Sequence, residues 1–536
     1  MKRAYIAAIG LMLILAMAWM IATRGRRQQQ AFPGTPQVRI TISKETTYIT
    51  EPLREDGYVD YLAALNQIAS KGVTPENNAA VPFLKAMGPA AIDKGQRETY
   101  FKMLGVAPLP EKGDYFVPLD KYAKRPTPAK KHAVWLSDEV DAVLEEQKHQ
   151  AATRPWSKKE FPVLAGWLAA NEKPLIAVVE ASKRPRRYDP LTAPDAYVMA
   201  ILLPVAKQYR EVARALAARA MLRAGEGKME EAWQDLLACH RLARLAGQGP
   251  TTVEFLVGFI VDGAACDGDQ GLLQRAQFTA AKSLKMRNDL AGLPPMPKMI
   301  DKIDPGERFS WLDSVRAVIQ NKDGGLLDTT SLDFSGNPKS TTSPLSPASR
   351  AAIDGNQVAL MVNSWLDRMV DAYCRPSRAK RLAALGQIDR DLNKALVEAG
   401  SWKTLARAAV LTGTQELTSR TTGILLATVA LPAISAYAVD EDRPAMQFEL
   451  TKLGFALAAY RADHGSYPAK LAELAPKYAP EIPKDLFNDA DLHYKPEGKG
   501  YLLYSVGING KDDGGKGIFD CKAGERWDDI SIRAEK

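Results

Sequence analysis

The residues best suited to chemistry lie near the C-terminus, in a stretch rich in aspartate and glycine. Residues 507–515 read GINGKDDGG, and the sequence WDD follows at 527–529. Ca²⁺ prefers about six to eight oxygen ligands, a mixture of carboxylates, amide oxygens and backbone carbonyls. Glycines permit the tight turns that direct carbonyl groups inward. The sequence therefore predicts a calcium site, whose side-chain oxygens come from Asn509, Asp512, Asp513, Asp528 and Asp529. The alternative is a hydrated loop without a metal.

Motifs of the common catalytic and nucleotide-binding sites do not occur in the sequence. There is no GxSxG elbow, HExxH motif, P-loop or GxGxxG after a strand, and the five histidines and four cysteines form no local zinc pattern. His240 lies on the apolar stripe of its helix, which favours a hydrogen-bonded core residue over a catalytic group. Basic clusters at 124–131 and 183–187 are typical of solvated charge, so no nucleic-acid partner is expected. A glycosidase-type carboxylate pair, assembled from distant positions, stays open.

The elements that must position the aspartate-rich loop occupy residues 440–536. The first of them is a predicted helix with one apolar face, formed by Leu450, Leu453, Leu457 and Tyr460. Strand-like stretches at 492–495 and 501–506 follow and are joined by a hairpin turn. This tail has 18 acidic and 14 basic residues and therefore a net charge of −4. Because the whole chain has a net charge of +8, residues 1–439 have a net charge of +12. The change in charge and pattern predicts a small α+β domain.

Four motifs of this tail resemble the globular domain of the major pseudopilin of bacterial type II secretion systems. In order, they are LGFALAAYRADHGSYPAKLAEL, IPKDLFND, YLLYSVGINGKDDGG and WDDI. The resemblance implies a helix that leads into a small antiparallel sheet, and a calcium-binding loop. Carried over residue by residue, it implies ligands at Val506 (through its carbonyl), Asn509, Asp528 and Asp529. We expect Lys511 to add a further ligand through its backbone carbonyl. Asn509 stands where the family has aspartate, and residues 516–526 separate the two ligand groups further than is usual in the family.

A pseudopilin also has a leader that ends in glycine, followed by an apolar helix with glutamate at its fifth position. The N-terminus lacks this pattern, whereas Gly249 to Val257 imitates it in mid-chain. We interpret the imitation as coincidence. The tail is then a pseudopilin-like module on a different anchor, not a subunit processed into a filament.

Residues 1–30 have the pattern of a membrane anchor. An apolar run from Ala4 to Ala22 is flanked by basic residues on both sides. Nineteen helical residues are about 28 Å long, close to the hydrocarbon thickness of a bilayer. We expect a signal anchor that places residues 4–22 in the cell inner membrane as a single pass, with the bulk of the chain on the periplasmic side. A cleaved signal peptide, with a site at 16–18, is the alternative.

The chain between anchor and tail is predicted to be mainly helical. Its overall composition, 46% hydrophobic and 25% charged, excludes a wholly disordered, collagen-like or disulfide-scaffold protein. A helical domain at 31–320 contains a hairpin at 211–247 that resembles one tetratricopeptide unit, and an antiparallel pair inside a bundle is the favoured interpretation. Residues 321–350 have the composition of a flexible linker or long loop. Residues 351–439 are predicted to be helical and to pack on this body. Within them, 421–439 is predicted as a core helix, with a second membrane span as the alternative.

The predicted architecture is thus a mainly α protein: a large helical body after one transmembrane helix, and a small α+β domain at the C-terminus. The helical region resembles uncharacterised bacterial envelope proteins, which implies no function. We expect a non-enzymatic anchored protein that presents its tail for protein contacts, in the envelope or near a type II secretion machine. The alternative is an extracytoplasmic hydrolase or glycan receptor with a cleft in the body, lined by aromatic residues such as Trp135, Trp156 and Trp167.

Overall fold

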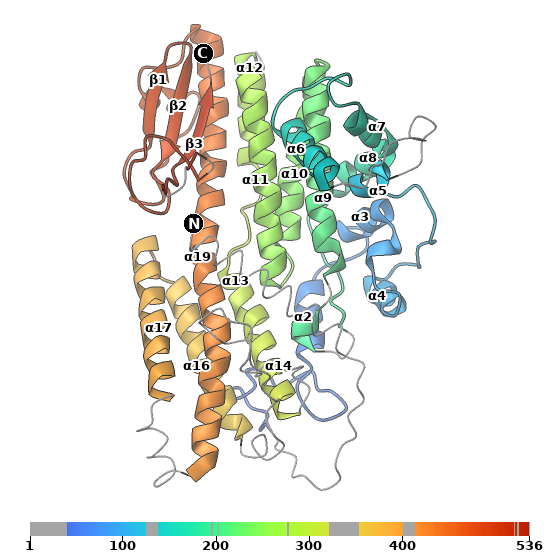
Figure 1. Ribbon diagram of the computed structural model, residues 1–536, viewed down its shortest axis with the longest axis vertical. Helices are drawn as coiled ribbons and strands as arrows, with labels where there is room; N and C mark the ends of the chain where they lie inside the picture. Colours follow the sequence, from blue (N-terminus) through green and yellow to red (C-terminus); the bar gives the residue numbers. More distant parts are fainter. Residues whose placement is uncertain are drawn as a thin grey trace.

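The computed structural model describes residues 40–124, 138–193, 197–201, 203–275, 278–320, 353–399, 413–518, 520–521 and 525–534. They form a mainly helical protein with a small three-stranded antiparallel sheet near the C-terminus, which confirms this part of the predicted fold class (Figure 1). The expected anchor at 1–30 and the expected linker at 321–350 lie outside the described residues. Within the described ranges, every helix is too short or too polar to cross a bilayer.

Several helices and helical turns precede the centre of the body in the chain. They are α2 (Tyr61–Ser70), α3 (Ala80–Met87), η1 (Pro89–Ala91), α4 (Arg97–Leu104), α5 (Leu119–Ala123), α6 (Asp138–Thr153), α7 (Pro162–Ala170), α8 (Glu172–Ala181) and η3 (Val198–Ala200). Much irregular chain lies between these helices, and its backbone polar groups need partners when they are buried.

Buried asparagines supply those partners. The side chain of Asn78 accepts a hydrogen bond from the backbone N–H of Tyr188 (3.0 Å) and donates one to the carbonyl of the same residue (2.9 Å). Asn171 contacts both backbone groups of Val117 in the same way, at 2.7 and 3.0 Å. Asn66 does so for Leu191, with both distances 2.9 Å. Each amide therefore acts like the backbone of a neighbouring strand.

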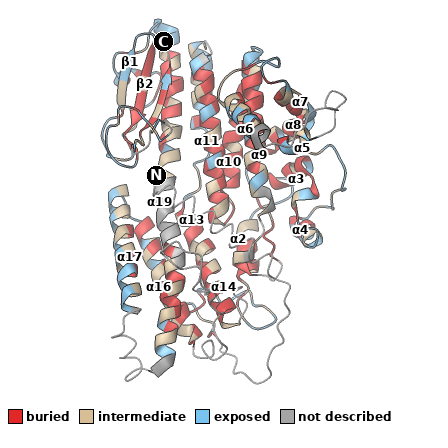
Figure 2. Ribbon diagram, in the orientation of Figure 1, coloured by how far each residue is buried: buried red, intermediate tan, exposed pale blue. Residues whose placement is uncertain are grey.

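Three long helices form the centre of the body: α9 (Pro204–Gly225), α10 (Met229–Ala246) and α11 (Thr252–Arg275). They are buried along much of their length (Figure 2). Helices α9 and α10 form the predicted hairpin, and α11 packs against both, so the hairpin is part of a bundle. The buried face of α9 is rich in alanine, which permits close approach of its neighbours. It includes Ala213, Ala215, Ala217, Ala218 and Ala220.

A second group of helices forms its own apolar core in the lower half of Figure 1. After α12 (Ala280–Ala291) and α13 (Ile300–Lys302), a π-helical turn η4 (Ile303–Glu307) leads into α14 (Arg308–Ile319), α16 (Gly355–Tyr373) and α17 (Arg378–Ala399). Of these, α14, α16 and α17 share a core with the first half of α19 (Gly413–His464). The core that they share includes Val315, Leu366, Ile388, Leu426 and Leu431.

Helix α19 joins this lower group to the tail without a break. It extends across the predicted boundary at 439/440 and contains the whole of the segment 421–439. In its second half, Leu453 and Leu457 pack against the sheet, whereas Phe455 packs against α10, α11 and α12. The helix of the tail is therefore buried between the sheet on one side and the body on the other (Figure 1).

The sheet has the order β1-β2-β3 and is antiparallel throughout. A short turn of helix, η7 (Leu471–Leu474), precedes β1 (His493–Glu497), β2 (Gly500–Ser505) and β3 (Ile530–Ala534). The predicted stretches 492–495 and 501–506 correspond to β1 and β2. The sequence does not predict β3, which lies next to α19 and α11 and completes the sheet on the side of the body.

Candidate metal centre

The two halves of the aspartate-rich segment leave the same end of the sheet. Ser505, the last residue of β2, pairs with Ile530, the first residue of β3. The loop that begins at Val506 therefore faces the residues that precede Ile530. Asp485 fixes the start of this loop, because its buried carboxylate accepts hydrogen bonds from the Ser505 hydroxyl and the Val506 N–H, both at 2.9 Å.

Three of the predicted ligands come together across this gap. One carboxylate oxygen from each of Asp513, Asp528 and Asp529 lies within 4.8 Å of the others. Oδ2 of Asp529 accepts hydrogen bonds from the N–H groups of Asp513 (3.0 Å) and Gly515 (2.8 Å). In contrast, Oδ1 of Asp528 and Oδ1 of Asp529 are enclosed and have no hydrogen-bond partner among the described residues. Enclosed, unsatisfied carboxylate oxygens fit a bound cation.

The electrostatics of the cluster would favour a bound cation. Burial raises the pKa of Asp529 to about 6, and the negative charge of Asp513 adds to the shift. Burial also raises the pKa of Asp528 above its usual range. The nearby guanidinium of Arg443, on α19, donates to the backbone carbonyl of Asp528 at 3.0 Å. The negative carboxylates repel one another at close range, which contributes to the raised pKa values. A bound divalent cation would attract the carboxylates and lower these pKa values.

Glycine is required at the point where the two chain segments touch. Gly507 has a φ of +64°, and a Cβ at this position would lie 2.2 Å from the carbonyl oxygen of Asp528. A side chain would therefore separate the loop from the aspartate pair. The positive φ is typical of the tight turns predicted for this loop, and whether its carbonyl groups bind a cation stays a prediction.

The other predicted ligands are placed differently. Asp512 lies apart from the three carboxylates, since its Oδ1 accepts from the Tyr504 hydroxyl at 2.9 Å. The side-chain oxygen of Asn509 accepts from the N–H of Lys511 at 2.6 Å, and its amide nitrogen donates to Asp513 at 2.9 Å. Val506 is buried at the start of the loop. Sequence reasoning missed Asp485 and Arg443, because each acts across a separation of more than 20 residues and forms no local pattern.

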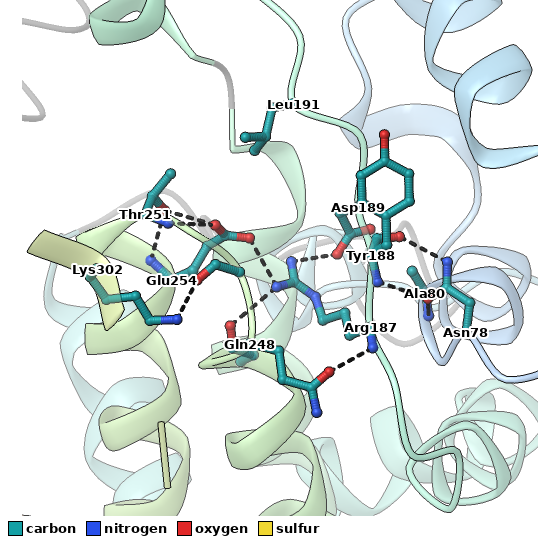
Figure 3. A network of polar contacts seen from close by, with 12 residues as sticks. Asn78, Ala80, Arg187, Tyr188, Asp189, Leu191, Gln248, Thr251, Glu254 and Lys302 are labelled. Carbon is teal, nitrogen blue, oxygen red and sulfur yellow. Dashed lines mark hydrogen bonds and ion pairs between the residues drawn. The ribbon is translucent and has the colours of Figure 1, made fainter. Parts of the chain in front are cut away.

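A second group of polar residues is buried in the body (Figure 3). The guanidinium of Arg187 donates to Glu254 at 2.9 Å and forms an ion pair with Asp189. The ammonium of Lys302 donates to the carbonyl oxygen of Gly249 at 2.7 Å, and burial lowers the pKa of this lysine to about 8. Gly249 and Glu254 are therefore fixed in this network, and a peptidase would have to unfold the body to reach the segment 249–257.

The tryptophans proposed for a cleft belong to the core. Trp156 and Trp167 are each 2% exposed, and their indole N–H groups donate to the carbonyls of Ala218 (3.0 Å) and Val117 (2.7 Å). Trp135 lies outside the described residues. The two described indoles are thus occupied by packing and backbone contacts.

His240 is a buried hydrogen-bonded residue, as predicted. Its two ring nitrogens face Asp262 (2.6 Å) and Asp269 (2.9 Å), both on the neighbouring helix α11.

No protein-family model, curated protein or solved structure matches this chain. The geometry of its own residues therefore has to support any function proposed for it.

Proposed function

We propose that this chain is a non-enzymatic, membrane-anchored protein of the bacterial envelope, whose pseudopilin-like tail binds Ca²⁺ and contacts other envelope or secretion proteins. The observation that supports it best is the pair of enclosed, unsatisfied oxygens of Asp528 and Asp529 beside the carboxylate of Asp513. Hard oxygen ligands on a glycine-rich loop suit Ca²⁺, which accepts irregular geometry. Residues 4–22 would hold the protein in the inner membrane, with the bulk of the chain on the periplasmic side.

The surface that the tail offers to a partner is the free edge of its sheet. Strand β1 pairs with β2 on one side, and its other side pairs with no strand in the described part of the chain. Its residues Lys495, Pro496 and Glu497 are exposed. An exposed edge can accept an extended segment of another protein, although Pro496 removes one backbone donor from the ladder.

Thermal unfolding of the full chain with Ca²⁺ or with a chelator tests the metal. A ligand present at about 100 times its dissociation constant stabilises the folded state by about 2.7 kcal/mol. We expect Ca²⁺ to raise the melting temperature of the wild type and of Asp491→Asn, an exposed carboxylate of the same tail, but not that of Asp529→Asn. Equal melting of the wild type in both buffers would remove calcium from the proposal.

Asp513→Asn provides a second variant, because Asp513 is less buried and less bound by the backbone than Asp529. Direct binding of radioactive Ca²⁺ to the wild type needs no variant at all.

Protease added outside spheroplasts tests the topology: digestion of the body supports the anchor, and full protection contradicts it. A photo-crosslinker at Lys495 tests the contact surface. Crosslinks that disappear in Asp529→Asn would support a calcium-dependent contact, and the absence of crosslinks in the wild type would contradict the edge as its site.

A further inference from the structure

A second cluster of metal-ligating side chains lies in the core, far from the tail loop in sequence. His240 is on α10, and Asp262, Cys266 and Asp269 are on α11. The three α11 residues are spaced i, i+4 and i+7, so they share one face of the helix. All four are buried, with at most 2% of each residue exposed.

The ligand atoms of three of these residues converge. One atom from each of His240, Asp262 and Cys266 lies within 4.8 Å of the others. Nδ1 of His240 is 2.6 Å from Oδ1 of Asp262, whereas Nε2, on the opposite side of the ring, is 2.9 Å from Oδ2 of Asp269. Oδ1 of Asp269 is enclosed and has no partner within the described ranges.

We propose that this cluster is a structural site for Zn²⁺, bound by Nδ1 of His240, a carboxylate oxygen of Asp262 and the thiolate of Cys266. Imidazole, carboxylate and thiolate are the ligands that Zn²⁺ takes in proteins, and the sulfur disfavours Ca²⁺ and Mg²⁺. Asp269 is the positioning residue. Metal-bound histidines commonly donate their second ring N–H to a carboxylate, and the contact from Nε2 to Asp269 has this geometry. A water molecule or the second oxygen of Asp262 would complete four-coordination.

The charges of the cluster balance with the ion in place. Without a metal, the imidazolium of His240 and the guanidinium of Arg244, which contacts Asp262, balance the two aspartates. With the ion, the charges are +2 for Zn²⁺, +1 for Arg244, −1 for each aspartate and −1 for the thiolate, while the imidazole is neutral. Loading then releases one proton from the imidazolium and one from the thiol to solvent. Both states are neutral overall, as burial demands.

The position of Cys266 is what separates this proposal from a metal-free ion pair network. The sulfur of Cys266 has the side chain of Thr451, on α19, as a hydrogen-bond partner, and it also lies within 4.8 Å of a ring nitrogen of His240 and a carboxylate oxygen of Asp262. A bound cation gives the sulfur a function at this position, because it stabilises the thiolate. Cys239, one residue before His240, offers a contrast. Its buried sulfur lies 3.5 Å from the carbonyl of Ala213, on the far side of the hairpin.

The first experiment measures the metal in the full chain, produced with zinc in the medium because a buried site fills during folding. X-ray absorption at the zinc edge of the wild type is expected to show one sulfur ligand at about 2.3 Å. Zinc surrounded by oxygen and nitrogen alone, or no zinc after purification, would overturn the proposal. This readout is separate from the calcium test, since the tail cluster of Asp513, Asp528 and Asp529 contains no sulfur.

Variants assign the ligands. We expect Cys266→Ser to lose the sulfur signal and most of the zinc, while Cys239→Ser, the matched buried thiol, retains both. Asp269→Asn is expected to keep the sulfur signal but to bind zinc about 10–100-fold more weakly. Wild-type zinc content in Cys266→Ser would refute the assignment. Circular dichroism identifies any variant that does not fold, and the wild-type absorption spectrum then decides the question alone.

Discussion

Truncation of Phe455 to alanine is expected to destabilise the tail and the body together. Phe455 belongs to the tail in sequence, yet its ring is fully buried against Trp233 of α10, with the ring centroids 5.4 Å apart and the planes at 75°. Buried side chains from three helices surround the pair, namely Leu237, Leu273, Met286 and Leu290. Because α10, α11 and α12 converge here, the backbone has little room to close a cavity.

The magnitude follows from what the ring loses. Replacing a buried phenylalanine by alanine typically costs about 3–5 kcal/mol, and more where the site cannot collapse. The edge-to-face contact with Trp233 contributes about 0.5–1.5 kcal/mol beyond the buried area. We therefore expect a loss near the upper end of that range. The lost contact joins the tail to the body, and it does not lie within the tail or within the body alone.

Hydrogen exchange followed by mass spectrometry locates the effect. In Phe455→Ala, exchange is expected to accelerate in peptides from β2 and also from α10, because the substitution weakens one cooperative unit. Leu457→Ala, buried against the sheet, is expected to affect both regions as well, whereas Val397→Ala, at an exposed position, is expected to affect neither. Unchanged exchange of β2 in Phe455→Ala would show that residues 440–536 fold as a separate domain.

Three further predictions concern the body. The folded chain releases the proton of Lys302 near pH 8 and the unfolded chain near 10.5, so stability should rise with pH between these values by about 1.4 kcal/mol per pH unit, and urea titrations should show this slope reduced in Lys302→Met. Asp235→Leu leaves the buried guanidinium of Arg219 without its bidentate partner and is expected to cost about 3–5 kcal/mol in chemical denaturation, much of which Arg219→Met should recover in the double variant. Gly225→Ala would place a Cβ 2.1 Å from the Trp156 carbonyl oxygen and should cost about 1–3 kcal/mol, whereas Gly263→Ala, with open space around it, should stabilise α11 by about 0.5–1 kcal/mol in the same assay.

Local periodicity was enough to predict a mainly helical body with a hairpin at α9 and α10. His240, predicted to lie on the apolar stripe of its helix, is buried in α10 together with Trp233, Leu236 and Leu237. Neighbours three and four positions apart lie on one face of a helix, so a pattern within a short window reports burial directly. The strands β1 and β2 could likewise be predicted from a short window, because successive side chains of a strand alternate between its two faces.

Contacts between distant segments could not be predicted in this way. The partners of His240 lie 22 and 29 residues further along the chain, and only the packing of α10 against α11 brings them to the ring. The asparagines that hold the irregular segments act across separations of 54 to 125 residues. Within the tail loop, Asp512 and Asp513 are adjacent in sequence, yet Asp513 belongs to the carboxylate cluster whereas Asp512 accepts a hydrogen bond from the Tyr504 hydroxyl.

The boundary placed at residue 440 shows how composition and structure can differ. Charge and pattern change there, but α19 continues, with Pro432 and Pro444 inside it. A proline within a helix removes one hydrogen bond and typically costs about 3 kcal/mol. The first half of this long helix contributes to the apolar core of the lower helices, and its second half to the core beneath the sheet. These apolar contacts offset the cost of the prolines.

The shared helix also limits how the tail can meet a partner. A helix that packs on one neighbour alone needs a single apolar stripe, whereas the second half of α19 buries Leu453 and Leu457 against the sheet and Phe455 against the body. Among the described residues of this half, these large apolar side chains are thus taken up by the sheet and the body. We therefore expect a partner to approach the edge at β1, the strand farthest from β3 and α19, or the aspartate-rich loop at the end of the sheet. If Ca²⁺ orders that loop, it acts on a surface whose position relative to the body is already fixed by the packing of α19.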